Sequence, residues 1–389
     1  MADNTTSKAS PLHHPHGKGS GGAGRGRSTR IIIAGGGTGG HIFPAIAIAN
    51  ALTKQEPGIE ILFIGARGKM EMEKVPQAGY QIEGLDIAGL NRQSMVKNVA
   101  LPFKVLKSFF RVRSIMKSFQ PDAVIGVGGY STYPVLRYAQ TRNIPTFIHE
   151  SNSFAGRANI MLGKKAARIF VASDRMEMFF PKDKIMITGN PVRSAIAHST
   201  HSRADGQQFF GLDAGKKTVL AVGGSLGARS INEAIAAHID VFEENGLQLI
   251  WQTGKTTAAE YKHIGEGKKN IWVNDFIREM EMAYAAADIV ISRAGAMAVT
   301  ELCVAAKPTI FVPYPLAAED HQTSNAMNLV HKHAALIVKD NEAKEKLVAA
   351  VVALAKDEAQ QRLLQTNIHA LAVTNADEVV AAEILKHIR

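Results

Sequence analysis

A histidine directly follows a glycine-rich turn near the start of the chain. Residues 31–40 form an apolar run that ends in glycines, and His41 comes next. Glycine lets the backbone approach a ligand closely, and a helix that begins here presents its first N–H groups to an anion. An imidazole on that first turn can donate to a phosphate or accept a proton, while helix capping is the structural alternative. We expect an anion-binding turn with a candidate base beside it.

A carboxylate stands in a similar setting in the second half of the chain. Residues 293–301 indicate a strand end, a glycine turn and a helix start, with Glu301 about one and a half turns into the helix. Its oxygens can accept both hydroxyls of a ribose while the helix N-terminus holds a diphosphate. The apolar neighbours Val299 and Leu302 argue against a solvated surface glutamate. Residues 320–325 carry amides and hydroxyls that suit a sugar, although they can equally cap a helix.

Other predicted strands also end in polar groups. Residues 149–152 place a second histidine and an amide at one strand end, and Arg193 puts a cation near the boundary between the two halves. The chain has no Asp-x-Asp pair, the motif with which a metal-dependent sugar transferase would usually hold its diphosphate. We therefore expect no metal and no cofactor. Helix N-termini, hydroxyls and Arg193 would carry the phosphate charge.

The elements that position these groups are short apolar runs alternating with longer amphipathic stretches. Several of the runs are continuously apolar, as in parallel strands that are covered on both faces. The pattern indicates an α/β fold with right-handed crossovers. Strands are predicted at 31–34, 59–64, 123–127, 146–149, 168–172, 219–222, 247–251, 288–292 and 309–312.

The two halves of the chain repeat one pattern. Residues 31–40 (IIIAGGGTGG) and 219–227 (VLAVGGSLG) each run from an apolar strand into a glycine turn, with a hydroxyl at the same place. Two such nucleotide-binding halves form a cleft lined by strand carboxyl ends, where ligands of this fold type bind. The turn is not the GxGxxG fingerprint, and residues 64–67 lack the acidic group that a nicotinamide ribose needs. A dehydrogenase is therefore disfavoured.

Composition limits the number of domains, the compartment and the classes of partner. The 389 residues predict two domains, and the single cysteine, Cys303, favours core packing in a reducing compartment. No run approaches the roughly 18 apolar residues of a spanning helix, and the polar N-terminus does not read as a signal peptide. The net charge of +10 favours polyanionic partners. It is concentrated between Asp86 and Asp122, where no acidic residue occurs.

The chemistry-bearing segments together resemble the MurG family of N-acetylglucosamine transferases. The resemblance covers the chain from about residue 30 to the C-terminus, and a dehydrogenase would not reproduce its series of ordered motifs. The motifs are GGTGGHIFPA (36–45), GVGGYSTYP (126–134), HESN (149–152), GNPVR (189–193), GGSLGAR (223–229), DFI (275–277), RAGAMAVTE (293–301) and DHQTSNA (320–326).

The resemblance implies two Rossmann-like domains facing across a cleft, the arrangement called GT-B. We expect a disordered tail over 1–29 and an acceptor- and membrane-facing domain over 30–197. A linker region would occupy 198–215, and a UDP-sugar-binding domain 216–370. A C-terminal helix within 371–389 would return to the first domain.

Carried over by motif position, the contacts of UDP-N-acetylglucosamine fall on both halves. The backbone of Ile277 would contact the uracil, and Glu301 would contact the ribose. Gln322 and Asn325 would contact the sugar. Acid–base or acceptor-side roles fall on His41 and His149. The expected substrate-binding residues are Thr38, Gly39, Gly40, Asn152, Arg193, Ser225, Ile277, Ala296, Met297, Ala298, Val299, Thr300, Glu301, Gln322 and Asn325.

Three positions depart from the family pattern. Many relatives have Gln where Ser151 and Leu226 stand, and a hydroxyl residue where Ala298 stands. The contacts of those individual side chains are therefore not carried over. Backbone N–H groups survive such substitutions, so the site as a whole is still expected.

The resemblance implies an inverting transfer of N-acetylglucosamine from UDP to the 4-hydroxyl of N-acetylmuramoyl-pentapeptide on undecaprenyl pyrophosphate. This reaction converts lipid I to lipid II in peptidoglycan synthesis. Expected partners are UDP-N-acetylglucosamine, lipid I and the anionic cytoplasmic face of the inner membrane, bound peripherally. Other cell-wall synthesis proteins are further candidate partners, and nucleic acid is not expected. The alternatives are a related GT-B transferase acting on diacylglycerol and a non-catalytic cell-wall scaffold.

The sequence of residues 101–119 predicts a helix that would face the membrane. Their apolar arc is wider than one core-facing stripe needs. A helix with such an arc and a cationic polar face suits the headgroup region of an anionic bilayer, and a core helix with a solvated basic face is the alternative. The apolar positions are Leu101, Phe103, Val105, Leu106, Phe109, Phe110, Val112, Ile115, Met116 and Phe119, and the cations are Lys104, Lys107, Arg111, Arg113 and Lys117.

Overall fold

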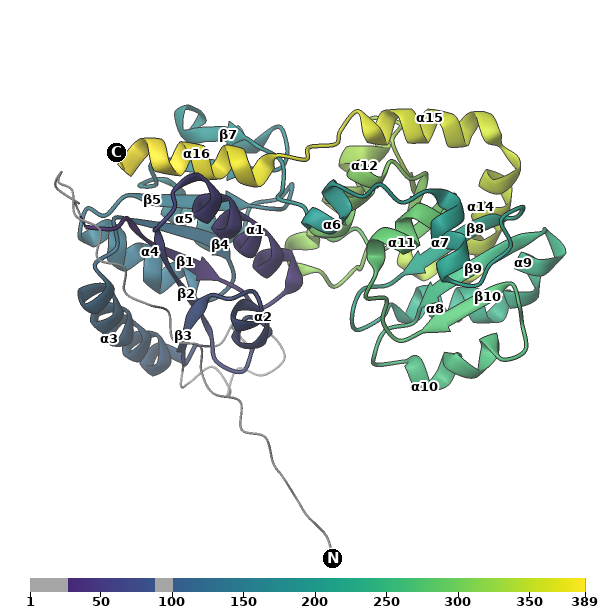
Figure 1. The fold of residues 1–389 in the computed structure, drawn as a ribbon, viewed down its shortest axis with the longest axis horizontal. Helices are drawn as coiled ribbons and strands as arrows, with labels where there is room; N and C mark the ends of the chain where they lie inside the picture. Colours follow the sequence, from purple (N-terminus) through teal and green to yellow (C-terminus); the bar gives the residue numbers. More distant parts are fainter. Residues whose placement is uncertain (1–26, 88–100, 389) are drawn as a thin grey trace, which may run out of the picture.

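The computed structural model describes residues 27–87 and 101–388, and the side chains of all of these except 101–106 and 318. Most of the predicted N-terminal tail, residues 1–26, therefore lies outside the described residues. The described chain forms two α/β domains that lie side by side (Figure 1). This confirms the predicted two-domain α/β architecture.

The first domain is built on a seven-stranded parallel sheet with the order β3-β2-β1-β4-β5-β6-β7. All six residues of β4 are buried, because helices cover both faces of the sheet. Side chains of α1 pack on one face, and side chains of α3, α4 and α5 pack on the other. The strands are β1 (Arg30–Gly35), β2 (Glu60–Ala66), β3 (Gln81–Leu85), β4 (Ala123–Gly128), β5 (Thr146–Glu150), β6 (Arg168–Val171) and β7 (Ile185–Ile187). The helices are α1 (Gly39–Gln55), α2 (Glu71–Gln77), α3 (Leu101–Phe119), α4 (Thr132–Thr141) and α5 (Arg157–Gly163), with short 3-10 turns η2 (Met176–Met178) and η3 (Lys182–Lys184).

The second domain repeats the plan with a six-stranded parallel sheet of order β10-β9-β8-β11-β12-β13. Helices α8, α9 and α14 pack on one face, and α11, α12 and α13 on the other. The strands are β8 (Lys217–Val222), β9 (Leu247–Gln252), β10 (Ile271–Asn274), β11 (Ile289–Ser292), β12 (Thr309–Phe311) and β13 (Leu336–Ile337). The helices are α6 (Ser194–Ala197), α7 (Arg203–Phe209), α8 (Arg229–Ala237), α9 (Ile239–Glu244), α10 (Ala258–Tyr261), α11 (Met280–Ala286), α12 (Ala296–Ala305), α13 (His321–Val330), α14 (Ala343–Lys356) and α15 (Glu358–His369).

The chain passes between the domains twice. It leaves the first domain after β7, and it returns after α15 to form α16 (Ala376–Ile388), seen in yellow beside α1 in Figure 1. Val380 and Ile384 of α16 are fully buried in the cluster that also holds Ile48 of α1. The two passages touch, because Val373 lies against Gly189. The hinge is therefore a pair of adjacent chain segments.

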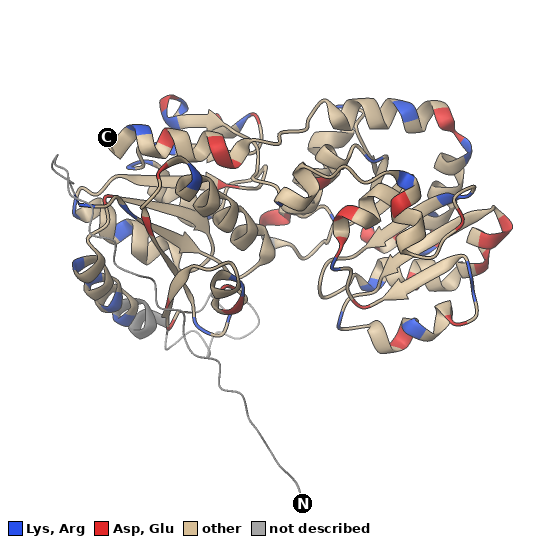
Figure 2. Ribbon diagram, viewed as in Figure 1, with Lys and Arg blue, Asp and Glu red and all other residues tan. Residues whose placement is uncertain are grey.

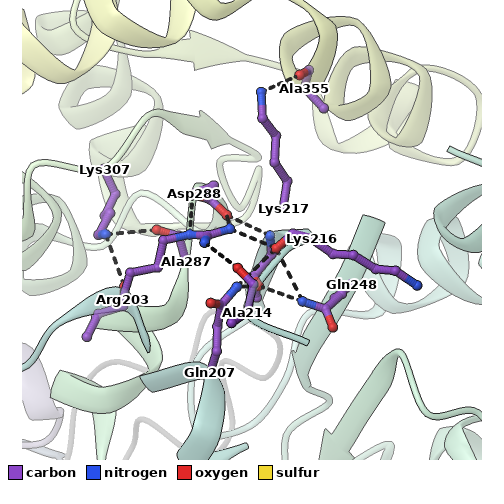
Figure 3. A network of polar contacts seen from close by, with 12 residues as sticks. Arg203, Gln207, Ala214, Lys216, Lys217, Gln248, Ala287, Asp288, Lys307 and Ala355 are labelled. Atoms are coloured by element: carbon purple, nitrogen blue, oxygen red, sulfur yellow. Dashed lines mark hydrogen bonds and ion pairs between the residues drawn. The ribbon is translucent and has the colours of Figure 1, made fainter. Parts of the chain in front are cut away.

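The segment expected as a linker, 198–215, instead carries α7, which packs on α11 of the second domain. Gly206 of α7 lies against the backbone of Ala286, and Arg203 pairs with Asp288 through hydrogen bonds of 2.8 and 2.9 Å. Figure 3 shows this network at the start of β8 and β11. Val192 and Ile196 also pack in the core of the second domain. The polar composition reflects the solvent-facing side of a packed helix.

No helix within residues 27–87 and 101–388 combines the length and the apolar character that crossing a membrane requires.

Candidate active site

The first glycine turn joins β1 to α1. Gly36 and Gly37 have φ angles of 142° and 90°, in the region that favours glycine. Helix α1 then begins at Gly39, and its N-cap Thr38 makes no side-chain capping hydrogen bond. The first N–H groups of a helix have no partner within the helix, so this end of α1, with Thr38, Gly39 and Gly40, has donors that an anion can accept.

His41 lies on the first turn of α1, and its imidazole is partly buried. Its Nδ1 is 3.0 Å from the carbonyl oxygen of Gly36 and 3.4 Å from the hydroxyl of Thr38. Because a carbonyl oxygen can only accept, Nδ1 carries the proton and Nε2 of the neutral ring keeps its lone pair. Burial lowers the pKa of His41 below its usual 6.5, although the Gly36 carbonyl and the charge of Glu150 oppose the shift. His41 is therefore neutral at pH 7 and has the tautomer of a base.

His149, the second predicted catalytic histidine, is in a different setting. It stands on β5 with no exposed surface, and its Nδ1 is 3.4 Å from the hydroxyl of Ser151. Burial lowers the pKa of His149 to about 4, so the ring is neutral. In this conformation a substrate cannot reach it.

Asn152 and Asn325, both expected to contact the substrate, meet across the domain boundary. The side-chain N–H of Asn325 donates to Asn152 Oδ1 at 3.4 Å and to the carbonyl of Ala294 at 3.1 Å. Its Oδ1 accepts from the backbone N–H of Ser153 at 3.0 Å, and the residue is 3% exposed. In this conformation Asn325 joins the two domains, and a sugar would have to displace these contacts.

Ile277 and Gln322 are each fixed by one hydrogen bond. The backbone N–H of Ile277 donates to Oε1 of Gln252 at 2.9 Å, and Gln252 donates in turn to the carbonyl of Gly224 in the second glycine turn. The carbonyl of Ile277 is therefore the backbone group to which a base N–H can donate. Oε1 of Gln322 accepts from the N–H of Tyr314 at 3.0 Å, which leaves its amide N–H groups as donors for a ligand.

The second glycine turn and the N-terminus of α12 form the corresponding part of the second domain. Ser225 is exposed in the turn after β8, and α12 begins at Ala296 with Gly295 as its N-cap. The predicted binding run therefore occupies the first turn and a half of α12, whose N-terminus suits a diphosphate. The hydroxyl of Thr300 donates to the carbonyl of Ala296 at 2.9 Å, so it is not directed at a phosphate. The other members of the run, Met297, Ala298 and Val299, are partly buried.

Arg193 and Glu301, predicted to contact the phosphate and the ribose, are paired with each other. Arg193 Nε and Arg193 Nη2 donate to the two carboxylate oxygens of Glu301 at 2.7 and 2.9 Å. The hydroxyl of Tyr284 donates to the same carboxylate at 3.2 Å. Burial, reinforced by the charge of Glu301, raises the pKa of Tyr284 well above 10.0, so its hydroxyl stays a donor. The guanidinium also lies 5.7 Å from the ring centroid of Phe43 on α1, so Arg193 contacts both domains.

A cavity of about 450 Å³ lies between the domains near the hinge. It is lined from the first domain by Ser151 and Asn190 and from the second by Thr300 and Asn325. Asn190 donates to the hydroxyl of Thr300 at 3.0 Å, so the cavity is bridged by side chains of both domains. Of the predicted binding residues, Ala296, Val299, Thr300 and Asn325 line this cavity.

Sequence reasoning missed three residues that hold this arrangement. Gln252 fixes Ile277, Tyr284 donates to Glu301, and Glu150 accepts from the backbone N–H of Asn152 at 3.1 Å. Glu150 stands inside the HESN motif, which was a usable signal. Gln252 directly follows the predicted strand 247–251, but Tyr284 carries no local signal. Of the three departures, Ser151 is buried, Leu226 is 70% exposed and Ala298 is partly buried.

Across the described ranges, no three His, Cys, Asp or Glu side chains gather closely enough to hold a metal ion.

The fold and the paired glycine turns define a protein of two Rossmann-like domains, and comparison with known families gives its class. Residues 31–171 match the glycosyltransferase family 28 N-terminal domain, and residues 218–382 match the C-terminal domain of the same family. The chain belongs to glycosyltransferase family 28. This confirms the predicted enzyme class.

Individual relatives narrow the family further. The chain is 50% identical to the UDP-N-acetylglucosamine–N-acetylmuramyl-(pentapeptide) pyrophosphoryl-undecaprenol N-acetylglucosamine transferase of Phocaeicola vulgatus, over 92% of this chain and 96% of that protein. It is 48% identical to the transferase of the same name from Flavobacterium psychrophilum, over 92% and 97%. The crystal structure of Acinetobacter baumannii MurG matches with a TM-score of 0.75 and 30% identity, over 92% of this chain and 99% of that one. The predicted family resemblance is confirmed.

More distant structures support the fold alone. The glycosyltransferase of kitacinnamycin matches with a TM-score of 0.70 at 15% identity, over 94% of this chain and all of that chain.

Proposed function

We propose that the chain transfers N-acetylglucosamine from UDP-N-acetylglucosamine to the 4-hydroxyl of N-acetylmuramoyl-pentapeptide on undecaprenyl pyrophosphate. The names of relatives that match over nearly the whole chain support this donor and this acceptor. The observation that carries the mechanism is the position of His41, a neutral histidine on an anion-binding helix end.

The reaction is a single in-line displacement with inversion at the anomeric carbon. Nε2 of His41 takes the proton of the acceptor hydroxyl as the new C–O bond forms, while Nδ1–H stays on the carbonyl of Gly36. A positioned base of this kind contributes about 10²–10⁴-fold to the rate. UDP leaves from the opposite face, toward the N-terminus of α12, where the first N–H groups stabilise its growing negative charge.

Donor binding exchanges the partners of Glu301 and Arg193. The side chain of Glu301 is 7% exposed, and the guanidinium of Arg193 contacts both carboxylate oxygens that would accept the ribose hydroxyls. When the ribose arrives, its hydroxyls replace the guanidinium on the carboxylate, and Arg193 turns to the diphosphate. Both charges keep a partner, which avoids the large cost of a buried, unpaired ion.

The acceptor is lipid-linked, and α3 is the surface that meets the membrane at its cytoplasmic face. In its described part, Val112, Ile115 and Met116 face the core, whereas Phe110 is 64% exposed. The exposed cations Lys107, Arg113 and Lys117 share the outer side of the helix with Phe110. Figure 2 shows α3 as a helix with basic and no acidic positions. An exposed aromatic ring among cations supports binding in the headgroup region of an anionic bilayer.

The side chains of Leu101, Phe103, Lys104, Val105 and Leu106, part of the predicted membrane face, lie outside the described residues. Arg111 forms an ion pair with Glu83 at 2.8 Å, so its charge is partly neutralised within the protein.

A transfer assay tests the proposal. The purified chain is incubated with radiolabelled UDP-N-acetylglucosamine and either a short-chain lipid I analogue or diacylglycerol. We expect the label to be transferred to the lipid I analogue and not to diacylglycerol. Transfer of the label to diacylglycerol would identify diacylglycerol as the acceptor instead. If the donor binds but neither lipid is labelled, a non-catalytic scaffold is favoured.

A further inference from the structure

The peptide unit between Gly36 and Gly37 is held at both ends by titratable side chains. The N–H of Gly37 donates to Oε2 of Glu71 at 2.8 Å. The carbonyl of Gly36 lies 3.0 Å from Nδ1 of His41. Both groups belong to one planar trans peptide and point in opposite directions. Carboxylate, peptide and imidazole therefore form one continuous chain of hydrogen bonds.

The protein is built to accommodate Glu71 at this place. The residue begins α2 and is 1% exposed, and its Oε1 accepts from the backbone N–H of Ala66 at 2.9 Å. A Cβ atom on either Gly36 or Gly65 would collide with the side chain of Glu71. Burying a charge is costly unless it is well hydrogen-bonded. The fold nevertheless buries the carboxylate of Glu71, a residue to which the mechanism above gives no role.

Such a chain of hydrogen bonds affects the base. A carboxylate on the N–H side polarises the peptide, so its carbonyl becomes a stronger acceptor for Nδ1–H. A stronger acceptor stabilises the imidazolium that forms when Nε2 takes a proton. This is what a carboxylate bound directly to a histidine does in other enzymes, and here a peptide lies between the two.

Other titratable groups act on His41 from the elements packed around it. Glu150 on β5, like Glu71 on α2, raises the pKa of His41, and His321 on α13 lowers it. His149 on β5 also lies within electrostatic reach. Of the two carboxylates, Glu71 is the one bonded to the peptide that fixes Nδ1.

We propose that Glu71 is a positioning residue, which orients and polarises His41 through the peptide between Gly36 and Gly37. The proposal rests on the role of His41 as the base in the proposed function. When the acceptor O–H bond breaks and the Nε2–H bond forms, Glu71 neither gains nor loses a proton. It holds the carbonyl that receives Nδ1–H.

Nitrogen NMR of the full chain labelled with ¹⁵N-histidine tests the proposal without depending on activity. The His41 signals are assigned from their loss in His41→Gln, and the ring is titrated in wild type and in Glu71→Gln. We expect the pKa of His41 to fall in Glu71→Gln, because one nearby negative charge is gone. We also expect the preference for a proton on Nδ1 to weaken. Asp288→Asn, which changes a carboxylate that accepts the backbone N–H of Thr218 in the second domain, should change neither property.

Kinetics separate this proposal from the function on which it rests. If His41 is the base, the acidic limb of the kcat profile should move down with the NMR pKa, and the plateau should fall about three- to tenfold, with KM for the donor unchanged. An NMR shift without a kinetic shift would support the relay and remove His41 as the base. An unchanged pKa and tautomer in Glu71→Gln would overturn the relay.

Glu71→Asp keeps the charge but shortens the side chain by one methylene group. We expect an intermediate pKa for His41, which a purely space-filling role of Glu71 would not produce. If Glu71→Gln does not fold, Glu71→Asp decides alone. A lowered pKa supports the relay, and an unchanged one overturns it.

Discussion

Arg193 and Glu301 are joined by two hydrogen bonds of 2.7 and 2.9 Å. Arg193 stands at the first passage between the domains, and Glu301 stands in α12 of the second domain. The pair therefore couples the hinge to the place where the ribose is expected, and each residue should affect the other.

Glu301→Ala should weaken the binding of UDP-N-acetylglucosamine about ten- to a hundredfold, because the ribose diol loses a charged acceptor worth about 1.5–3 kcal/mol. Titration calorimetry measures the affinity, and Glu260→Ala on the exposed side of α10 is the control. Arg193→Ala and the double variant complete a cycle, in which we expect non-additive effects because the two side chains are in contact. Unchanged donor affinity in Glu301→Ala would remove this residue from the site.

His41→Ala should lower turnover about 10²–10⁴-fold with little change in donor affinity, because it removes the base and no donor contact. The sign of the pH dependence follows from the base role. Activity needs neutral His41, so in wild type the rate falls as the pH drops through a pKa below 6.5. The variant should lack this limb, and the exposed His263 provides a control substitution. A variant that loses mainly donor affinity would assign His41 to phosphate binding.

His149 should make the fold sensitive to acid. Its pKa is depressed from 6.5 to about 4, so the unfolded chain binds its proton before the folded one does. The stability it contributes is complete above pH 6.5 and is lost between pH 6.5 and 4, by about 3 kcal/mol in total. Urea unfolding at pH 7 and pH 4.5 measures the effect. In His149→Asn the difference between the two pH values should shrink, and an equal difference in both proteins would contradict the burial argument.

The outer side of α3 should bind anionic membranes. Replacing Lys107, Arg113 and Lys117 with Glu should release the protein from vesicles containing anionic lipid at low salt, since each cation near such a surface contributes about 1 kcal/mol. Co-sedimentation measures this, with wild type also tested at high salt. The same charge change at Lys344, Lys346 and Lys356, exposed on α14, is the matched control. If both triple variants sediment like wild type, α3 is not the docking surface.

The sequence predicted the central strands of both sheets and missed β3, β7, β10 and β13. Each of these four lies at a sheet edge. Central strands such as β4 are buried on both faces and are apolar without interruption. An edge strand such as β3, with the sequence QIEGL and a mostly half-buried pattern, lacks that signal because only part of its surface is covered.

The sequence by itself determined the fold class, the glycine turns and the family, because these depend on local patterns and on the order of motifs along the chain. Only the tertiary structure decided which predicted residues face a ligand and which face each other. It buried His149, joined Asn325 to Asn152 across the domains and set Arg193 against Glu301. It also brought Glu71 beside the glycine turn, although 34 residues separate it from Gly37. Such contacts depend on how strands and helices far apart in the chain pack together, and no local pattern records that packing.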